Sequence, residues 1–258
     1  MSLYAQDGLH VYAAKEGDLT VLYAENREVC AVSVKLSLTL DNLSVLEPGD
    51  GIYTVPANTD HYRLAALEKI REHGKSSYSY NYSAVYGDVR QTTYDHDYIY
   101  DLPFRSGLQA RVDQGYNGTF SHQGENALDF NMKEGTEVCA ARAGLVIAVV
   151  QHFNENCWRD ECKKMANYVL IQHSDGTIAE YNHLLFNGAK VRVGDMVEKG
   201  ELIALSGNTG YTRGPHLHFD CYLPGFDARR TLITKFRTGK GNNTAYLAEN
   251  KTYKKNYS

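Results

Sequence analysis

Five residues in the second half of the chain carry side chains that can bind a metal ion or transfer a proton: His122, Asp129, His183, His216 and His218. The last two alternate within an apolar run that has the pattern of a β-strand. Side chains two residues apart on a strand point to the same face, roughly 6 to 7 Å apart along it. One strand can therefore direct two imidazoles into one cleft. A carboxylate and a histidine from elsewhere would complete a mixed nitrogen and oxygen site of the kind that zinc prefers.

The chemistry of such a site follows if His122, Asp129 and His218 bind one divalent ion. Two neutral imidazoles and one carboxylate leave zinc with one net positive charge, and three protein ligands leave a coordination position open, which is typical of catalytic sites. The ion would activate water and polarise a peptide carbonyl. His183 and His216 are then candidates for moving protons and stabilising an oxyanion. Because His216 shares a strand face with His218, it must lie near the metal if His218 binds it.

Each of these signals is weak when taken alone. One H-x-H pair arises easily among ten histidines, a histidine in a strand is usually an ordinary hydrogen-bonding group, and Asp129 alone fits a turn before Phe130. The ordered set favours the metal site. A second cluster, Asp95-His96-Asp97, is better interpreted as a solvated loop, because three adjacent residues converge on one ion only through an unusual turn.

Alternating apolar and polar residues predict mostly β-structure around these candidates. Val32 to Leu40 alternates without a break, and tyrosines 78, 80 and 82 repeat the same period. With turn signals at short intervals, the first 90 or so residues predict a small β-sandwich. Residues 64–73 are a candidate helix by composition, and residues 87–103 read as a connector. Strands in the second half are predicted at 137–141, 145–151, 168–173, 177–181, 191–193, 202–206 and 216–223.

Size and composition narrow the classes of protein. The chain has 258 residues, 43% hydrophobic and 22% charged, as in an ordinary globular protein that needs no disulfides to form a core. A net charge of −4 gives no sign of nucleic-acid binding. No apolar run is long enough for a transmembrane helix, and no signal peptide is visible at the N-terminus. Twenty tyrosines fit partly wet β-surfaces better than a sugar-binding face.

Five cysteines are present. Cys157 and Cys162 lie in a polar stretch that reads as a loop between two strands, where a local disulfide would imply an oxidising compartment. Two free thiols are nearly as plausible an interpretation, and a zinc knuckle is a weaker one, because no second pair follows at metal-binding spacing. Cys30, Cys139 and Cys221 lie in apolar strand-like runs and are interpreted as buried thiols.

Taken together, several motifs over about residues 112–225 resemble the lysostaphin-type, or LytM-like, zinc metallopeptidases, which cleave peptide cross-links of bacterial cell walls. The matching runs include 115–122 (GYNGTFSH), 127–130 (ALDF), 134–138 (EGTEV), 141–146 (ARAGLV), 167–173 (NYVLIQH), 181–184 (YNHL), 193–197 (VGDMV), 206–210 (SGNTG) and 214–219 (GPHLHF). The resemblance implies a mainly β protein with an antiparallel peptidase domain and a narrow groove. The spacing between His122 and Asp129 is longer than is usual in the family.

The resemblance also implies functional residues. His122, Asp129 and His218 would bind one Zn²⁺ ion, and His183 and His216 would be the catalytic histidines. Substrate contacts are suggested for residues beside the groove, Tyr116, Tyr211 and Arg213, although solvent-facing loop roles fit them equally well. The implied substrate is a peptidoglycan peptide, and the implied location is the cell envelope, either periplasmic or secreted. Neither the scissile bond nor the oligomeric state follows from the sequence.

The predicted organisation has three parts. Residues 1–100 form a β-sandwich-like domain with the connector, residues 101–240 form the peptidase domain, and residues 241–258 form a tail that is a candidate for a strand returning to the first domain. Residues 229–236 are a second candidate for such a strand. The first domain more weakly resembles the β-sandwich that precedes the peptidase in some family members.

Two other functions were weighed against an active peptidase. A catalytically silent cell-wall-binding or regulatory module would keep the fold, but such relatives usually lack a ligand or histidine position, and all five are filled here. The run Val193 to Gly200 also resembles hairpins of biotinyl and lipoyl carrier domains. A carrier needs a modifiable lysine at an exposed turn between two such halves, and no lysine has that setting.

Overall fold

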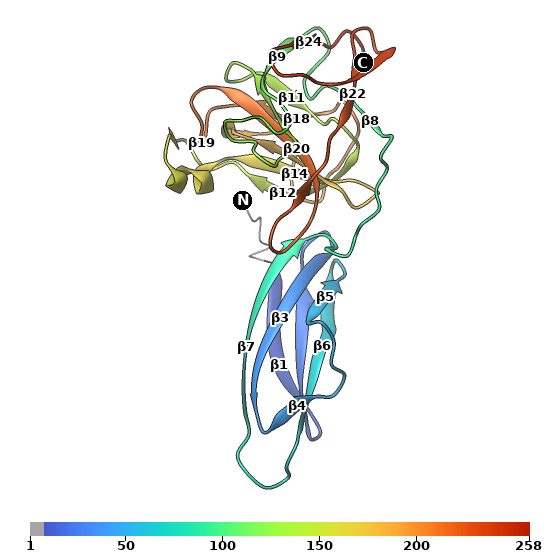
Figure 1. The fold of residues 1–258 in the computed structure, drawn as a ribbon, viewed down its shortest axis with the longest axis vertical. Coiled ribbons are helices and arrows are strands. Elements are labelled where there is room, and N and C mark those ends of the chain that lie inside the picture. The colour runs from blue at the N-terminus through green and yellow to red at the C-terminus, as the bar shows by residue number, and fades with distance from the viewer. Residues whose placement is uncertain (1–7) are drawn as a thin grey trace. The chain divides into compact units, whose positions relative to one another are not determined.

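The computed structural model describes residues 8–258, which divide into two compact units (Figure 1). Unit 1 comprises residues 1–91 and 224–229, and unit 2 comprises residues 92–223 and 230–258. The division therefore falls at residue 91 rather than at 100. The loop at 224–229, which lies inside the predicted peptidase domain in sequence, belongs to unit 1. The prediction that the N-terminus shows no signal peptide concerns a segment whose first seven residues lie outside the described part.

Unit 1 consists of two antiparallel sheets, with strand orders β1-β2-β6-β4 and β5-β3-β7. Buried residues from both sheets form one shared core, so the predicted β-sandwich is confirmed. The strands are β1 (Leu9–Glu16), β2 (Leu19–Asn26), β3 (Val32–Asp41), β4 (Leu43–Val45), β5 (Ile52–Val55), β6 (Thr59–Lys69) and β7 (Ser77–Tyr86).

Strand β6 corrects the helix predicted at residues 64–73. Its alanine, leucine, glutamate and lysine residues have high helix propensity, but the strand pairs with β2 on one side and with β4 on the other. Residues Leu64 to Leu67 are all buried. A half-exposed helix would leave part of this run in water, so tertiary packing decides against local propensity.

Unit 2 is built around a large antiparallel sheet with the strand order β17-β12-β14-β15-β20-β10-β9-β24, and β21 pairs with β20 (Figure 1). Its strands are β9 (Gln109–Gln114), β10 (Ala127–Asn131), β12 (Gly144–Val150), β14 (Tyr168–Gln172), β15 (Ile178–Asn182), β17 (Met196–Val197), β20 (His216–Leu223), β21 (Arg230–Thr231) and β24 (Thr252–Lys254).

Three smaller sheets and one short helix complete unit 2. The sheets have the orders β11-β18-β16, β23-β22-β8 and β13-β19. Their strands are β8 (Ile99–Tyr100), β11 (Glu137–Cys139), β13 (Asn156–Cys157), β16 (Leu184–Ala189), β18 (Leu202–Ser206), β19 (Gly210–Tyr211), β22 (Lys235–Thr238) and β23 (Asn243–Tyr246), and the 3₁₀-helix η1 spans Asp160–Met165.

A dense aromatic core fixes the central strands of unit 2. Tyr181 on β15, Phe219 on β20 and Phe236 on β22 are fully buried. The ring of Phe219 packs edge-on against each of the other two, at 5.2 and 5.8 Å between centroids. Such contacts add directional packing to the apolar burial. The core therefore anchors the two strands that carry, or immediately precede, three of the candidate histidines.

The chain end differs from expectation. The tail was a candidate for pairing with the first domain, but β24 pairs with β9 and β23 pairs with β22, both inside unit 2. The second candidate, residues 229–236, also pairs within unit 2 through β21 and the start of β22. Strand β9 would otherwise present an unpaired edge, which β24 covers.

The strand predicted at 191–193 was also wrong, because those residues enter a turn before β17.

No helix within residues 8–258 is long and apolar enough to cross a membrane.

Candidate active site

The register of two neighbouring strands brings the carboxylate and one histidine together. Strands β10 and β20 are antiparallel, and Asp129 lies directly opposite His218. Directly paired residues in a sheet place their side chains about 5 Å apart on one face. Asp129 Oδ1 is 2.9 Å from His218 Nδ1. Two residues separated by most of the second half of the chain are thus adjacent because of sheet order alone.

His122 reaches the same point from the loop before β10. Its Nδ1 is 3.1 Å from the carbonyl oxygen of Gly115. A carbonyl only accepts hydrogen bonds, so Nδ1 carries the proton and Nε2 presents a lone pair. That Nε2 is buried, makes no hydrogen bond with any residue that the structure describes, and lies 3.3 Å from Asp129 Oδ1. The loop therefore delivers an unprotonated nitrogen to the Asp129 carboxylate.

These three residues have the geometry of a metal site. One ligand atom each from His122, Asp129 and His218 lies within 4.8 Å of the other two. Buried polar atoms are nearly always hydrogen-bonded, so a buried lone pair on His122 with no donor in reach indicates a missing electrophile. Two imidazoles and a carboxylate are also a donor set that zinc accepts. The residues present fit a divalent metal ion.

The electrostatics of the site favour the charged forms of both Asp129 and His218. Burial opposes ionisation of Asp129, but the hydrogen bond from His218 and the nearby imidazoles of His122 and His216 hold its pKa well below 3.8. Burial would likewise lower the pKa of His218, but its hydrogen bonds to Asp129 and Asp220 raise that pKa to about 10. The cluster is therefore organised around negative charge, as a cation-binding site requires.

His183 and His216 lie beside the three donors. Their ring centroids are 4.6 Å apart, and the ring of His183 is 6.0 Å from that of His218. His183 follows β15, whose Asn182 pairs with His218, and it has a left-handed backbone with φ of 60°. This conformation is uncommon for a residue with a side chain and is found more often at functional sites.

Backbone carbonyls set the tautomer of both histidines. His183 Nδ1 donates to Thr209 O at 2.7 Å, and His216 Nδ1 donates to Gly214 O at 2.8 Å. In each ring the Nε2 atom is left to accept a proton when the ring is neutral. Burial, together with the neighbouring imidazoles of His216 and His218, lowers the pKa of His183 to about 3. His183 is therefore neutral and able to accept a proton at Nε2.

The sequence did not point to several residues that orient this cluster. Gln114 on β9 donates from Nε2 to Asp129 Oδ2 at 3.1 Å. Asp220 accepts from His218 Nε2 at 3.2 Å. Thr212 contacts His216 Nδ1 through its hydroxyl at 3.2 Å. Asp220 was detectable, because it extends the H-x-H pattern by one more alternate position on the same strand.

The three suggested substrate contacts separate into two groups. The hydroxyl of Tyr116 donates to Thr234 O at 2.7 Å, and burial raises its pKa, so this side chain is committed to internal packing. Tyr211 and Arg213 instead surround Trp158, which is 39% exposed. The ring of Tyr211 stacks on Trp158 at 4.4 Å, and the guanidinium of Arg213 lies 3.9 Å from its ring centroid.

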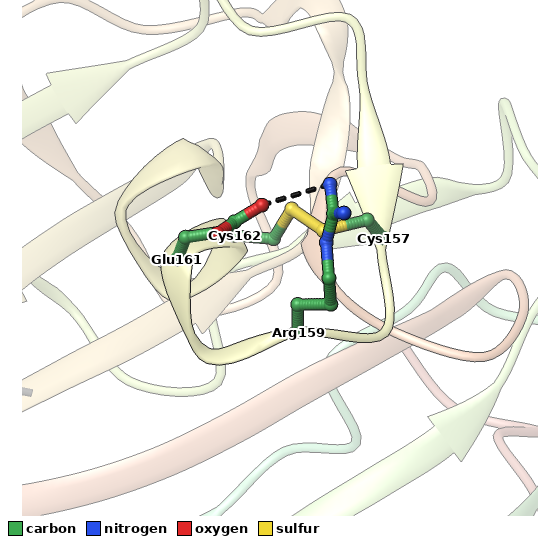
Figure 2. The surroundings of a disulfide bond; sticks show 4 residues. All are labelled: Cys157, Arg159, Glu161 and Cys162. Atoms are coloured by element: carbon green, nitrogen blue, oxygen red, sulfur yellow. Dashed lines mark ion pairs between the residues drawn. A yellow bond between two sulfur atoms is a disulfide. The ribbon is translucent and has the colours of Figure 1, made fainter.

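Trp158 is carried by a loop closed by a disulfide bond. The structure joins Cys157 and Cys162, with Cα atoms 5.8 Å apart, and Figure 2 shows the ion pair between Arg159 and Glu161 on the same loop. The loop begins in β13, which pairs in parallel with β19. The remaining cysteines, Cys30, Cys139 and Cys221, are free and buried.

Comparison with known proteins finds a family that this part of the chain resembles. Residues 123–228 match peptidase family M23, and the matched range holds four of the five candidate residues, all except His122. Over this range the chain is similar to the peptidases of that family. The fold expected from the resemblance, mainly antiparallel β, is confirmed.

Several curated relatives match part of this chain. Peptidoglycan DD-endopeptidase ShyA of Vibrio cholerae is 36% identical over 100 residues, which are 39% of this chain and 20% of the relative. Glycyl-glycine endopeptidase ALE-1 of Staphylococcus capitis is 33% identical over 147 residues, which are 55% of this chain and 36% of the relative. The match therefore spans about a third or less of the length of these relatives. The crystallised catalytic domain of lysostaphin from Staphylococcus simulans is 28% identical, covering 48% of this chain and 87% of that domain, with a TM-score of 0.35.

Proposed function

We propose that this protein is a zinc-dependent metalloendopeptidase that hydrolyses peptide cross-links of bacterial peptidoglycan outside the cytoplasm. The observation that carries the proposal is the convergence of His122, Asp129 and His218 within 4.8 Å, beside two further histidines with fixed tautomers. Three donors from one carboxylate and two imidazoles are typical of hydrolytic zinc sites, whereas structural sites normally have four protein ligands.

A zinc ion bound there would supply Lewis acidity toward the scissile carbonyl and would make water a nucleophile near neutral pH. Residues of the protein orient the rings that would bind the ion. Asp220 and Gly115 O fix the rings of His218 and His122, so that the ligand atoms need not reorient on binding.

Proton transfer is assigned to His183 and His216. The neutral Nε2 of His183 accepts a proton, because its Nδ1–H is held by Thr209 O. His216, with Nδ1 held by Gly214 O, directs Nε2 toward the reacting carbonyl, where a protonated ring would donate to the developing oxyanion and to the leaving amine. His216 Nε2 lies 3.7 Å from Asp129 Oδ1, and the ring of His183 is 4.6 Å from that of His216.

The substrate class is supported by the names of relatives and by the cysteine chemistry. Both ShyA and ALE-1 are named for peptidase activities, and ShyA is named a peptidoglycan endopeptidase. A disulfide between Cys157 and Cys162 fits an oxidising compartment such as the periplasm or the exterior. Peptidoglycan lies in that same compartment.

The test is to incubate the zinc-loaded protein with whole sacculi and to identify released fragments by mass. We expect cross-linked dimers to become monomers, a chelator to stop the reaction and zinc to restore it. The alternative, a silent cell-wall-binding or regulatory module, predicts that the protein binds sacculi and releases no fragment. That outcome from a fully metallated preparation would reject the enzyme.

A further inference from the structure

Four side chains stack into one cluster next to the candidate active site. Trp158 stacks with Phe120 at 5.0 Å and with Tyr211 at 4.4 Å between ring centroids, with interplanar angles of 10° and 14°. The guanidinium carbon of Arg213 lies 3.9 Å from the Trp158 centroid and 4.3 Å from that of Phe120. Phe120 and Trp158 are 52% and 39% exposed. Large aromatic rings at a soluble surface are normally buried more deeply, so this rim cluster calls for an explanation.

The rim cluster is attached to the catalytic residues at both sides. Phe120 precedes the ligand His122 by two residues, and its backbone N–H donates to Gln114. Arg213 lies between Thr212 and Gly214, which together hold Nδ1 of His216. A substrate backbone that reaches the metal ligands and His216 therefore passes close to Arg213.

Arg213 has no acidic partner among residues 8–258. Its contacts among the residues the structure describes are the two aromatic rings. Two carboxylates of the neighbouring disulfide loop are occupied elsewhere, Glu161 by Arg159 and Asp160 by Lys163, each at 2.8 Å (Figure 2 shows the first pair). The exposed positive charge of Arg213 is thus left without an internal neutralising group.

Stacking prepares this arginine for one kind of ligand. Rings against the face of a guanidinium attract the cation and restrict its plane, while the N–H groups at its edge stay free. That edge matches the two oxygens of a carboxylate, which it binds through two parallel charge-assisted hydrogen bonds. A lysine would present the same charge without the planar fork.

We propose that Arg213, held by Phe120 and Trp158, is a specificity-determining residue that binds a free carboxylate of the cross-linked peptide. The inference rests on the proposed function and narrows its substrate. Cross-links that carry an unamidated carboxylate near the scissile bond are preferred over uncharged oligoglycine bridges. The disulfide between Cys157 and Cys162 serves this subsite by limiting the freedom of the loop that carries Trp158.

The test compares substrates that differ in one group. The probes are a purified cross-linked peptide dimer with free carboxylates, two forms of it amidated at either the side-chain or the C-terminal carboxylate, and a pentaglycine-bridged peptide. For the zinc-loaded wild type, we expect kcat/KM to fall about tenfold when the recognised carboxylate is amidated, mainly through KM. The two singly amidated forms identify which carboxylate is recognised.

Variants connect the preference to the arginine. Arg213→Gln is expected to process the free and amidated dimers equally, and Arg213→Lys is expected to recover part of the preference. Arg159→Gln is the matched control, because it removes a charge from the neighbouring loop that already pairs with Glu161. Preference for the free carboxylate that survives in Arg213→Gln, or equal use of all dimers by the wild type, would overturn the proposal.

A binding measurement separates this inference from the proposed activity. Calorimetric titration of the metal-free protein with the free and amidated dimers needs no turnover. If no peptide is cleaved but the free dimer binds about tenfold more tightly in an Arg213-dependent manner, the proposed function fails and the carboxylate subsite stands. If peptides are cleaved while binding ignores amidation, the activity stands and the subsite is rejected.

Discussion

Two histidines in unit 2 have the same local arrangement and different surroundings. His122 and His173 are both buried, each has Nδ1 on a backbone carbonyl, Gly115 O at 3.1 Å and Ala143 O at 2.9 Å, and each has a buried Nε2 with no hydrogen bond. Around His122, Asp129 and His218 converge. Around His173, the ring of Tyr100 lies edge-on at 6.1 Å and Arg142 acts as a nearby positive charge.

The different surroundings of His122 and His173 indicate what a buried imidazole needs in order to bind a metal ion. An unpartnered lone pair is not sufficient, since His173 has one too. A second and third donor of the right kind must reach the same point, and at His122 one of these donors is a carboxylate that also supplies negative charge. Beside His173 the nearest carboxylate, Asp175, pairs with Arg142 at 2.8 Å, so positive charge is already present there.

The largest effect is expected when one of the three proposed metal-binding side chains is removed. His218→Ala should lose metal binding and lower turnover by at least about 10³-fold, because two ligands hold zinc poorly and no group replaces the third. Metal content and cleavage of sacculi measure both effects. His152→Ala, at an exposed histidine outside the cluster, is the control. Full zinc content in folded His218→Ala would show that the ligand is misassigned.

A smaller effect is expected at His183, the neighbouring histidine to which we assign proton transfer. His183→Ala should retain one equivalent of zinc and lower kcat by about 10² to 10⁴-fold, the usual contribution of a general acid or base. Near-ultraviolet circular dichroism checks that the aromatic packing of the variant is native. Unchanged kcat would remove the proton-transfer role, and lost zinc would make His183 part of the metal site.

The sequence identified the five central residues because their types are specific and their order is fixed along the chain. Local patterns also located most central strands. The pattern could not show that β10 lies between β9 and β20, since sheet order depends on long-range pairing. For the same reason the predicted pairing of the tail with the first domain was wrong, and the sequence did not show that Gln114 would contact the site. Its role exists only once β9 lies beside β10.

The next effect concerns how His173, the buried histidine outside the site, changes the stability of the protein with pH. Burial, opposed by the hydrogen bond to Ala143 and helped by Arg142, lowers the pKa of His173 to about 4 from an ordinary value of 6.5. The unfolded chain therefore takes up the proton first. The contribution of neutral His173 to the free energy of unfolding is complete above pH 6.5 and is lost as the pH falls toward 4. Between pH 7.5 and pH 5 the free energy of unfolding should fall by about 2 kcal/mol for this reason.

Denaturant unfolding at these two pH values, followed by fluorescence of the single tryptophan, Trp158, measures this change in unit 2. His173→Gln cannot titrate and should show a pH dependence weaker by that amount, whatever its absolute stability. His152→Gln, at an exposed position, should keep the wild-type slope. An unaltered pH dependence in His173→Gln would mean that the buried ring titrates normally.

The smallest effect tests how the donor cluster is held in place. Gln114 is buried and uses its whole amide: Nε2 donates to Asp129 Oδ2 and to Ser121 Oγ, while Oε1 accepts from the backbone N–H groups of Phe120 and Ser121. Because backbone N–H groups only donate, the amide oxygen must face them, and the NH₂ group must face the carboxylate. One side chain thus links β9, the loop that leads to His122, and the ligand Asp129.

Gln114→Leu removes both connections, and we expect zinc affinity to fall about 10 to 100-fold, as is usual when a group that orients a ligand is lost. Gln114→Glu keeps the acceptor for the backbone but loses the donor to Asp129 Oδ2, and its added negative charge attracts the cation, so its affinity should fall less than that of Gln114→Leu. Competition with a chelator of known affinity measures both. Gln109→Glu, exposed on the same strand, adds the same charge without touching the carboxylate. Equal zinc affinity in all three variants would mean that the sheet alone, through the pairing of Asp129 with His218, holds the site in place.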